Sequence, residues 1–338
     1  GCTRCSYWWT NHRYVFTHIS NRSNRLTYSI FNFIYITTII IKGFILEQFI
    51  HLLESNSLFF YGFVFVLSLM IGSFLNVVIY RFPKMMEQGW YQECREFLAD
   101  ELKETPAKDS SPLTLSTPDS TCPHCQHKIR FYENIPVLSW LILRGKCSQC
   151  KQSISARYPL VEISTALLSL LVAQHFGVTS LTCYALLLTW GLIALTMIDF
   201  DHMLLPDQIV LPLLWLGLFV NLNNSIVPLE DAVIGAIAGY SSLYIVFWLF
   251  KLATGKEGMG FGDFKLFALF GAWVGWQLLP LLILMASVVG AFIGISLMLF
   301  KGHQKGQAIP FGPYLAIAGW ITLLWGENIW SWYLLQIL

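Results

Sequence analysis

Two groups of aspartates have the types and spacing to do chemistry together. Asp199, Asp201 and Asp207 follow one apolar run, and Asp263 ends the run Gly260-Phe261-Gly262-Asp263. An ionised carboxylate can act as a base on water, while a second, protonated carboxyl polarises a carbonyl. Two neighbouring carboxyls do not ionise together easily, so one pair can supply both roles at a single pH. These residues therefore fit amide hydrolysis by an aspartate pair.

The residue types alone leave several assignments open. Asp199 and Asp201 are equally suited to be the first member of the pair, because both lie at the end of the same apolar run. Asp207 is also a candidate N-cap for the next helix. The glycines before Asp263 suit unusual dihedral angles or a closely approaching substrate strand, although a flexible loop would also use glycine. Glu162, just inside another apolar run, fits an interfacial salt bridge as well as a function.

A cysteine cluster forms the second candidate site. Two CxxC pairs, separated by 21 residues, contain Cys122, Cys125, Cys147 and Cys150. This spacing is typical of a zinc ribbon, in which four thiolates complete a tetrahedron around one ion. No ligand position would stay open, so the expected zinc is structural. A redox dithiol or unrelated buried cysteines are the alternatives, and His124 or His127 could replace a thiolate.

The composition indicates that the elements carrying these sites lie in a membrane. Of the 338 residues, 55% are hydrophobic and only 12% are charged, and the mean hydropathy is +0.57. Soluble domains usually carry about 25% charged residues. The net charge of +1 gives no indication of nucleic-acid binding.

Eight apolar runs are close to the length of about 20 residues that a helix needs to cross a bilayer. They are 58–80, 158–176, 181–198, 208–222, 231–250, 264–280, 281–300 and 313–337. We place the break between the sixth and seventh runs at Pro280. The sequence therefore predicts an all-α polytopic membrane protein with about eight transmembrane helices and a zinc-ribbon-like cytoplasmic loop.

The positive charges predict the topology. All sixteen Lys and Arg residues after residue 45 lie in 81–157, near 251–265 or near 301–305. With eight helices, these segments share one face, and such charges mark the cytoplasmic side. The segments that carry Asp199 and Asp263 then lie at the same depth on that face. Both ends of the eight-helix core would face the other side.

The N-terminal segment 1–45 differs from the rest of the chain. The first methionine is Met70, and the segment lacks the small-residue cleavage site of a secretory signal. A ninth apolar run, 30–50, overlaps it. We treat 1–45 as an extension and expect the true start near Leu46.

The motifs taken together resemble the type IV prepilin peptidase family, also called leader peptidase/N-methyltransferase, over almost all of 58–325. The matching segments are Gly72-Ser73-Phe74-Leu75-Asn76-Val77-Val78, the two CxxC pairs with Glu133-Asn134-Ile135-Pro136 between them, Arg157-Tyr158-Pro159-Leu160-Val161-Glu162, 199–207, 255–265 and Pro310-Phe311-Gly312-Pro313.

The resemblance implies the roles of several residues. The family's two catalytic aspartates fall on Asp199 and Asp263, the latter in its Gly-x-Gly-Asp signature. The expected function is removal of the leader from type IV prepilins and type II secretion pseudopilins at the cytoplasmic face of a bacterial inner membrane. The expected domains are a first transmembrane helix at 58–80, a cytoplasmic loop at 81–157 that carries zinc and methyl transfer, and a peptidase domain at 158–338.

Methylation of the new N-terminus rests on the resemblance alone. The family uses S-adenosylmethionine as methyl donor, but the sequence contains no Gly-x-Gly-x-x-Gly motif after a strand. The residues that bind the donor are therefore not assigned.

Two other functions compete with this one. A transporter or proton-coupled membrane protein would use the aspartates as a relay, and it predicts carboxylates near the middle of the bilayer on facing helices. A zinc-stabilised assembly factor would leave the aspartates and the glycines without a use. The clustering of the aspartates at one membrane interface favours the peptidase.

Overall fold

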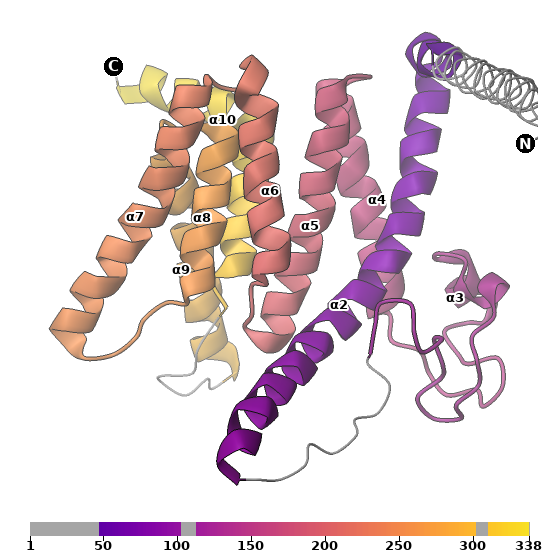
Figure 1. The fold of residues 1–338 in the computed structure, drawn as a ribbon. Coiled ribbons are helices and arrows are strands. Elements are labelled where there is room, and N and C mark those ends of the chain that lie inside the picture. The colour runs from indigo at the N-terminus through magenta and orange to yellow at the C-terminus, as the bar shows by residue number, and fades with distance from the viewer. Residues whose placement is uncertain (1–46, 103–112, 302–309, 338) are drawn as a thin grey trace, which may run out of the picture. The chain divides into compact units, whose positions relative to one another are not determined.

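The computed structural model describes residues 47–102, 113–301 and 310–337 (Figure 1). The chain divides into two units, Gly1–Phe60 and Tyr61–Leu338. In the first unit, residues 47–55 are helical. The predicted extension 1–45, the expected start near Leu46 and most of the run 30–50 lie outside the described residues.

The prediction of an all-α protein is confirmed, and each of the eight apolar runs forms a helix. The helices are α2 (Ser57–Leu102), α4 (Arg157–Phe176), α5 (Ser180–His202), α6 (Asp207–Val220), α7 (Leu229–Thr254), α8 (Phe261–Val274), α9 (Leu279–Lys301) and α10 (Gly312–Ile337). Within the described ranges, five of them (α2, α4, α5, α7 and α9) are long and apolar enough to cross a membrane. Helices α6 and α8 have only 14 residues each.

Helix α2 extends much further than the predicted first span, 58–80. It continues to Leu102, through residues that the sequence assigned to the loop 81–157. Pro83 lies inside the helix without ending it. The residues after Pro83 include many Met, Glu, Gln, Arg and Leu, which are good helix formers. Helical propensity therefore carries the element beyond the end of its apolar run.

The break between α8 and α9 lies at Gly275, so the prediction that places it at Pro280 is wrong. Helix α8 ends at Val274, and Gly275 follows with φ 76°, a left-handed value that favours glycine. Pro280 is the second residue of α9. A proline is tolerated in the first turn of a helix, because the N–H that it lacks would have no partner there.

Helix α8 lies at the centre of the packing and contacts α6, α7 and α10 (Figure 1). Every residue from Leu266 to Val274 is buried. Helix α7 approaches so closely that a Cβ at Gly235 or Gly271 would overlap the backbone of the other helix. The indole N–H of Trp273 donates to the carbonyl of Leu213 on α6, with 2.9 Å between nitrogen and oxygen. Close packing on several sides fixes the position of α8.

A buried asparagine holds the far end of α8. The Asn221 side chain is fully buried and donates to the carbonyls of Ala272 and Trp273 at 3.0 and 3.2 Å. Its amide oxygen accepts from the N–H groups of Ile226 and Val227, at 3.1 Å each. All its hydrogen-bonding groups are satisfied within the protein, which is the usual condition for burying a polar side chain.

Helices α2, α4 and α5 pack around a separate apolar cluster. Its buried members are Leu75, Ile79, Val161 and Ala194. A Cβ at Gly72 would lie 2.8 Å from the Cα of Glu162, so α2 and α4 can approach this closely only because residue 72 is glycine.

Candidate active site and cysteine cluster

Asp199 and Asp263 lie at helix ends. Asp199 is in the last turn of α5, and its carbonyl accepts from the N–H of Met203, the left-handed residue that ends the helix. Asp263 is the third residue of α8, and its carboxylate accepts from the N–H of Gly260 at 3.3 Å. Asp199 thus lies at the C-terminal end of α5, and Asp263 lies at the N-terminal end of α8, most of whose residues are buried.

Leu205 lies beside the segments that carry both carboxylates. This leucine follows α5 and contacts two glycines, Gly262 and Gly312. The Gly312 N–H donates to the Asp199 carboxylate, and the Asp199 and Asp263 carboxylates are close enough to interact electrostatically. The turn between α5 and α6 and the segments that lead into α8 and α10 all lie at the lower end of these helices in Figure 1.

Burial and pairing distinguish these two aspartates from their neighbours. Asp199 and Asp263 are only 5% and 7% exposed. Arg157 binds both oxygens of Asp201, at 2.9 and 2.5 Å. Lys265 binds both oxygens of Asp207, at 2.8 and 2.7 Å. Among the ion pairs of the described ranges, none includes Asp199 or Asp263.

This pairing favours Asp199 over Asp201 as the partner of Asp263. The Arg157 guanidinium binds both oxygens of Asp201 in an exposed ion pair, whereas Asp199 and Asp263 are buried without an ion pair among the described residues. Asp207 is likewise engaged, and it is not the N-cap of α6, because Pro206 occupies that position and Asp207 is the first helical residue. The carboxylates of Asp199 and Asp263 influence each other electrostatically, and neither is held in an ion pair among the described residues.

The glycines before Asp263 were expected to allow unusual dihedral angles or the close approach of a substrate strand, and the structure gives them a different use. Gly260 has ordinary extended dihedral angles, φ −81° and ψ 149°, so an unusual backbone conformation is not the reason for glycine there. Close approach does explain Gly262, where a Cβ would lie 2.8 Å from the Cβ of Leu205. The approaching group belongs to the protein itself.

Glu162 does not form the interfacial salt bridge that its position suggests. Its carboxylate accepts from the N–H of Val137 at 2.7 Å, and Arg157 pairs with Asp201 instead. Val137 precedes the short helix α3 (Leu138–Ile142). The buried carboxylate therefore ties α4 to the segment between the two cysteine pairs.

The four cysteines of the predicted zinc site come together. All four sulfurs lie within 4.8 Å of one another, with 3.8 Å between those of Cys122 and Cys150 and 4.0 Å between those of Cys125 and Cys147. A tetrahedron with Zn–S bonds of about 2.3 Å has sulfurs about 3.8 Å apart. The cluster thus has the dimensions of a four-thiolate zinc site. His127 points to Glu133 at 3.2 Å and is not part of the group.

The backbone repeats the same turn around both cysteine pairs. Cys122 N–H donates to the carbonyl five residues later, and Cys147 N–H does the same. Gln126 and Lys151, each directly after its CxxC pair, both have φ 59°. The backbone N–H groups of Cys125 and His124 lower the pKa of the Cys122 thiol to about 7. Burial and hydrogen bonds to the other three cysteines instead raise the pKa of the Cys125 thiol to about 11, so the four thiols do not ionise alike.

Comparison with known proteins assigns the chain to a family. The profile described as Bacterial Peptidase A24 N-terminal domain matches residues 66–176, and the profile described as Type IV leader peptidase family matches residues 186–295. A prepilin leader peptidase/N-methyltransferase of Stutzerimonas stutzeri is 57% identical over 285 residues, which cover 84% of this chain and 97% of the relative. The chain belongs to the prepilin leader peptidase/N-methyltransferase family.

Other members of the prepilin leader peptidase/N-methyltransferase family align over a similar length. The protein of Pseudomonas aeruginosa is 56% identical over 282 residues, covering 83% of this chain and 96% of the relative. That of Legionella pneumophila is 45% identical over 276 residues, covering 82% and 95%. No solved structure matches the chain. The cysteine cluster falls inside the first profile match, and Asp199 and Asp263 fall inside the second.

Two features of the site escaped the sequence analysis. Arg157 was expected as the partner of Glu162, but it pairs with Asp201 and so distinguishes Asp201 from Asp199. No sequence pattern indicated that Leu205, an ordinary residue of an apolar segment, would lie at the site. The motif Pro310-Phe311-Gly312-Pro313 had been matched to the family without a role, and the contact between Gly312 and Asp199 supplies one.

Proposed function

We propose that this chain removes the leader from type IV prepilins and type II secretion pseudopilins, and that it then methylates the new N-terminus. One observation carries the peptidase assignment. Asp199 and Asp263 are buried, interact with each other and have no cationic partner among the described residues, whereas Asp201 and Asp207 are both paired. The names of the relatives support both activities.

The proposed chemistry needs one proton shared between two carboxyls. The ionised member removes a proton from water, and the oxygen of that water attacks the carbonyl carbon of the scissile bond. The protonated member donates to the carbonyl oxygen and stabilises the developing charge. The leaving amine then takes a proton from the pair. The Gly312 N–H, which donates to Asp199, orients that carboxylate.

We assign peptidase chemistry to 158–338 and methyl transfer to the loop 81–157, with S-adenosylmethionine as methyl donor. The cysteine cluster would hold one structural zinc through Cys122, Cys125, Cys147 and Cys150. The sulfur spacing and the two matching backbone turns support this proposal. The zinc would stabilise the fold of the loop, because four thiolates leave it no open position for chemistry.

We place the protein in the bacterial inner membrane, with its catalytic face in the cytoplasm. The one-sided distribution of Lys and Arg supports this orientation. The carboxylates lie at helix ends, and this position suits a substrate whose apolar segment remains in the bilayer. The competing transporter hypothesis called for carboxylates midway along facing helices, and neither Asp199 nor Asp263 has that position.

Replacement of each aspartate by asparagine tests the assignment. Asp199→Asn and Asp263→Asn keep the shape of the side chain and remove the titratable group, so each should lower the kcat/KM of prepilin cleavage by about 100-fold or more. The double variant should be little worse than either single one, because the pair acts as a unit. Cleavage of a purified prepilin, followed by the gel shift of the product, measures the effect.

Asp201→Asn and Asp207→Asn are the matched controls and should retain most of the activity. An inactive Asp201→Asn protein beside an active Asp199→Asn protein would move the first catalytic role to Asp201. Normal cleavage by Asp263→Asn would refute the two-aspartate mechanism itself.

A further inference from the structure

The buried carboxylate of Glu162 lies where three segments of the chain meet. It accepts from the N–H of Val137 in the loop 81–157 at 2.7 Å, and from the hydroxyl of Ser73 on α2. The side chain is only 7% exposed and belongs to none of the ion pairs among the described residues. A buried carboxylate needs hydrogen-bond donors. Through these two donors, Glu162 holds both α2 and the loop against α4.

Val137 has a backbone conformation that valine rarely adopts. Its φ is 60° and its ψ is −49°, and the N–H of Leu138 donates to the carbonyl of Pro136. These three residues form a γ-turn with positive φ, a turn that is rare and strained, and a β-branched central residue adds to the strain. Such a turn persists only where neighbouring contacts hold it, and strained turns gather at functional sites. The hydrogen bond from the central N–H to Glu162 is the contact that holds this one.

The turn at Val137 sets the position of the segment that carries the cysteines. Helix α3 begins at the next residue. The indole N–H of Trp140, on α3, donates to the carbonyl of Ile154 at 3.3 Å, and Ile154 lies four residues after Cys150. A displacement of the turn would therefore move α3 and the backbone beside the second cysteine pair together.

The first turns of α4 also contact the helix end that carries Asp199. Arg157, the first residue of α4, binds both oxygens of Asp201, which lies two residues after Asp199. Glu162 follows Arg157 by five residues on the same helix. The start of α4 thus holds the loop through Glu162 and the end of α5 through Arg157, and so it fixes the distance between them.

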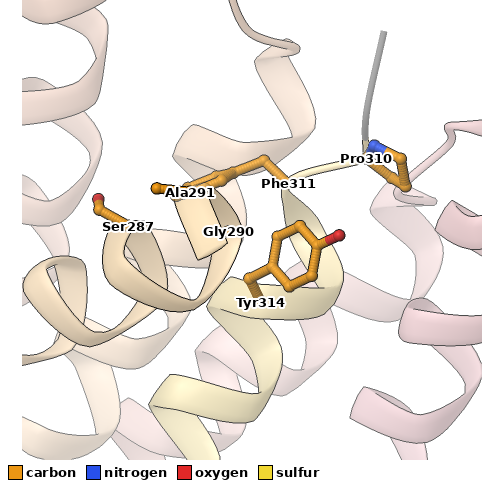
Figure 2. Close-up of a pocket in the computed structure, with 6 residues that line it drawn as sticks. All are labelled: Ser287, Gly290, Ala291, Pro310, Phe311 and Tyr314. Carbon is orange, nitrogen blue, oxygen red and sulfur yellow. The ribbon is translucent and has the colours of Figure 1, made fainter. Parts of the chain in front are cut away.

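The pocket between α9 and the start of α10 makes no such connection (Figure 2). It is lined by Ser287, Gly290, Ala291, Pro310, Phe311 and Tyr314. None of these residues belongs to the loop or to α4, so the pocket does not contribute to the placement of the loop.

We infer that Glu162 is a positioning residue for methyl transfer, because its hydrogen bond to Val137 holds the loop where it can reach the amino group that cleavage releases. The inference rests on the proposed function, in which the loop carries methyl transfer, and it adds a residue to that function. In the reaction the amine nitrogen bonds to the methyl carbon of S-adenosylmethionine. The bond from that carbon to the sulfonium sulfur breaks with its electron pair going to sulfur, and one proton passes from the nitrogen to water. Glu162 acts through the position of Val137 and not on the reacting atoms.

Methyl transfer from labelled S-adenosylmethionine to a pilin that has already been cleaved tests the inference, beside prepilin cleavage by the same sample. Glu162→Ala removes the acceptor and should lower the kcat/KM of methyl transfer by about tenfold to 100-fold, with cleavage within about twofold of wild type. Glu162→Gln keeps an oxygen that accepts from Val137 and should retain most of the transfer. Val137→Gly, added to Glu162→Ala, should restore part of it, because glycine adopts positive φ without strain. Glu327→Ala, which removes an exposed glutamate from α10, should match the wild type in both assays.

The ratio of methyl transfer to cleavage on one sample does not change with a misfolded fraction, so it separates positioning from folding. An unchanged ratio in Glu162→Ala would overturn the inference, because the residue would then serve both activities alike or neither. A Glu162→Gln protein that methylates as poorly as Glu162→Ala would also overturn it, since the charge and not the hydrogen bond would matter. Absence of methyl transfer in the wild-type protein is a distinct result, which would overturn the proposed methyl transfer and this inference with it.

Discussion

At the scale of single residues, Gly312 has no room for a side chain, because the Asp199 carboxylate lies directly beside it. A Cβ there would lie 2.6 Å from Oδ2 of Asp199, well inside van der Waals contact. We predict that Gly312→Ala displaces the carboxylate and lowers the kcat/KM of prepilin cleavage by about tenfold to 100-fold, because displacements of about 1 Å have such effects on catalysis. Gly89→Ala is the control, since a Cβ at Gly89 meets nothing within 4 Å. Equal activity of the two variants would show that Asp199 tolerates the extra methyl group.

The residue types proposed for the chemistry could be read from the sequence, and the family motif pointed to Asp199 and Asp263, but chemistry alone could not choose between Asp199 and Asp201. Asp199 and Asp201 are two positions apart and have the same apolar context. The feature that separates them is Arg157, 44 residues before Asp201 in the chain and bonded to it in space. Contacts of this kind depend on how α4 packs beside α5, and no local pattern encodes that packing.

At the scale of elements, the two matching backbone turns that carry the cysteine pairs predict that the protein binds zinc. Purified protein should contain one zinc per chain, and Cys147→Ser should lose it, because four thiolates of matching geometry are needed for the site. Metal analysis measures the content. Limited proteolysis of residues 113–156 should become faster in the variant, since structural zinc contributes directly to folding. Cys183→Ser, which changes an exposed cysteine outside the cluster, should keep both the metal and the resistance. A metal-free wild-type protein with an intact, protease-resistant loop would contradict the zinc site.

Element type was predictable because it depends on local composition, while element ends were not. Long apolar runs leave a helix as the form that satisfies its own backbone in lipid, so all eight were found. The end of α8 depends on one positive φ value at Gly275, and glycine occurs in many other settings. In α2 the sequence contains Pro83, a residue type that usually breaks helices, but the helix continues past it.

At the scale of the whole molecule, the charge distribution predicts the topology. Reporter fusions at Ser110 and Ser225 should lie on opposite sides of the membrane, with Ser110 in the cytoplasm, because the Lys and Arg residues gather in 81–157 and avoid the segment near 225. A cytoplasmic reporter and a periplasmic reporter at each site give paired signals. The same compartment at both positions would mean that an odd number of the helices between them does not cross.

The two activities should also separate. Asp263 and the cysteine cluster fall in different profile matches, 186–295 and 66–176, so a lesion in one chemistry should spare the other. We predict that Asp263→Asn still transfers labelled methyl groups from S-adenosylmethionine to a pilin that has already been cleaved, at close to the wild-type rate. Loss of this transfer in a folded Asp263→Asn protein would indicate one shared site.

The short helix α6 bears on how water reaches a hydrolase that lies in lipid. Its 14 residues, at about 1.5 Å each, make it about 21 Å long, whereas a hydrocarbon core is about 30 Å thick. Its side chains Leu211, Trp215 and Phe219 are exposed. A bilayer can accommodate a crossing helix this short by thinning, and thinning would bring headgroups and their hydration toward the α5–α6 turn beside Asp199. The thickness of the surrounding bilayer is then part of the reaction conditions, as much as pH or temperature.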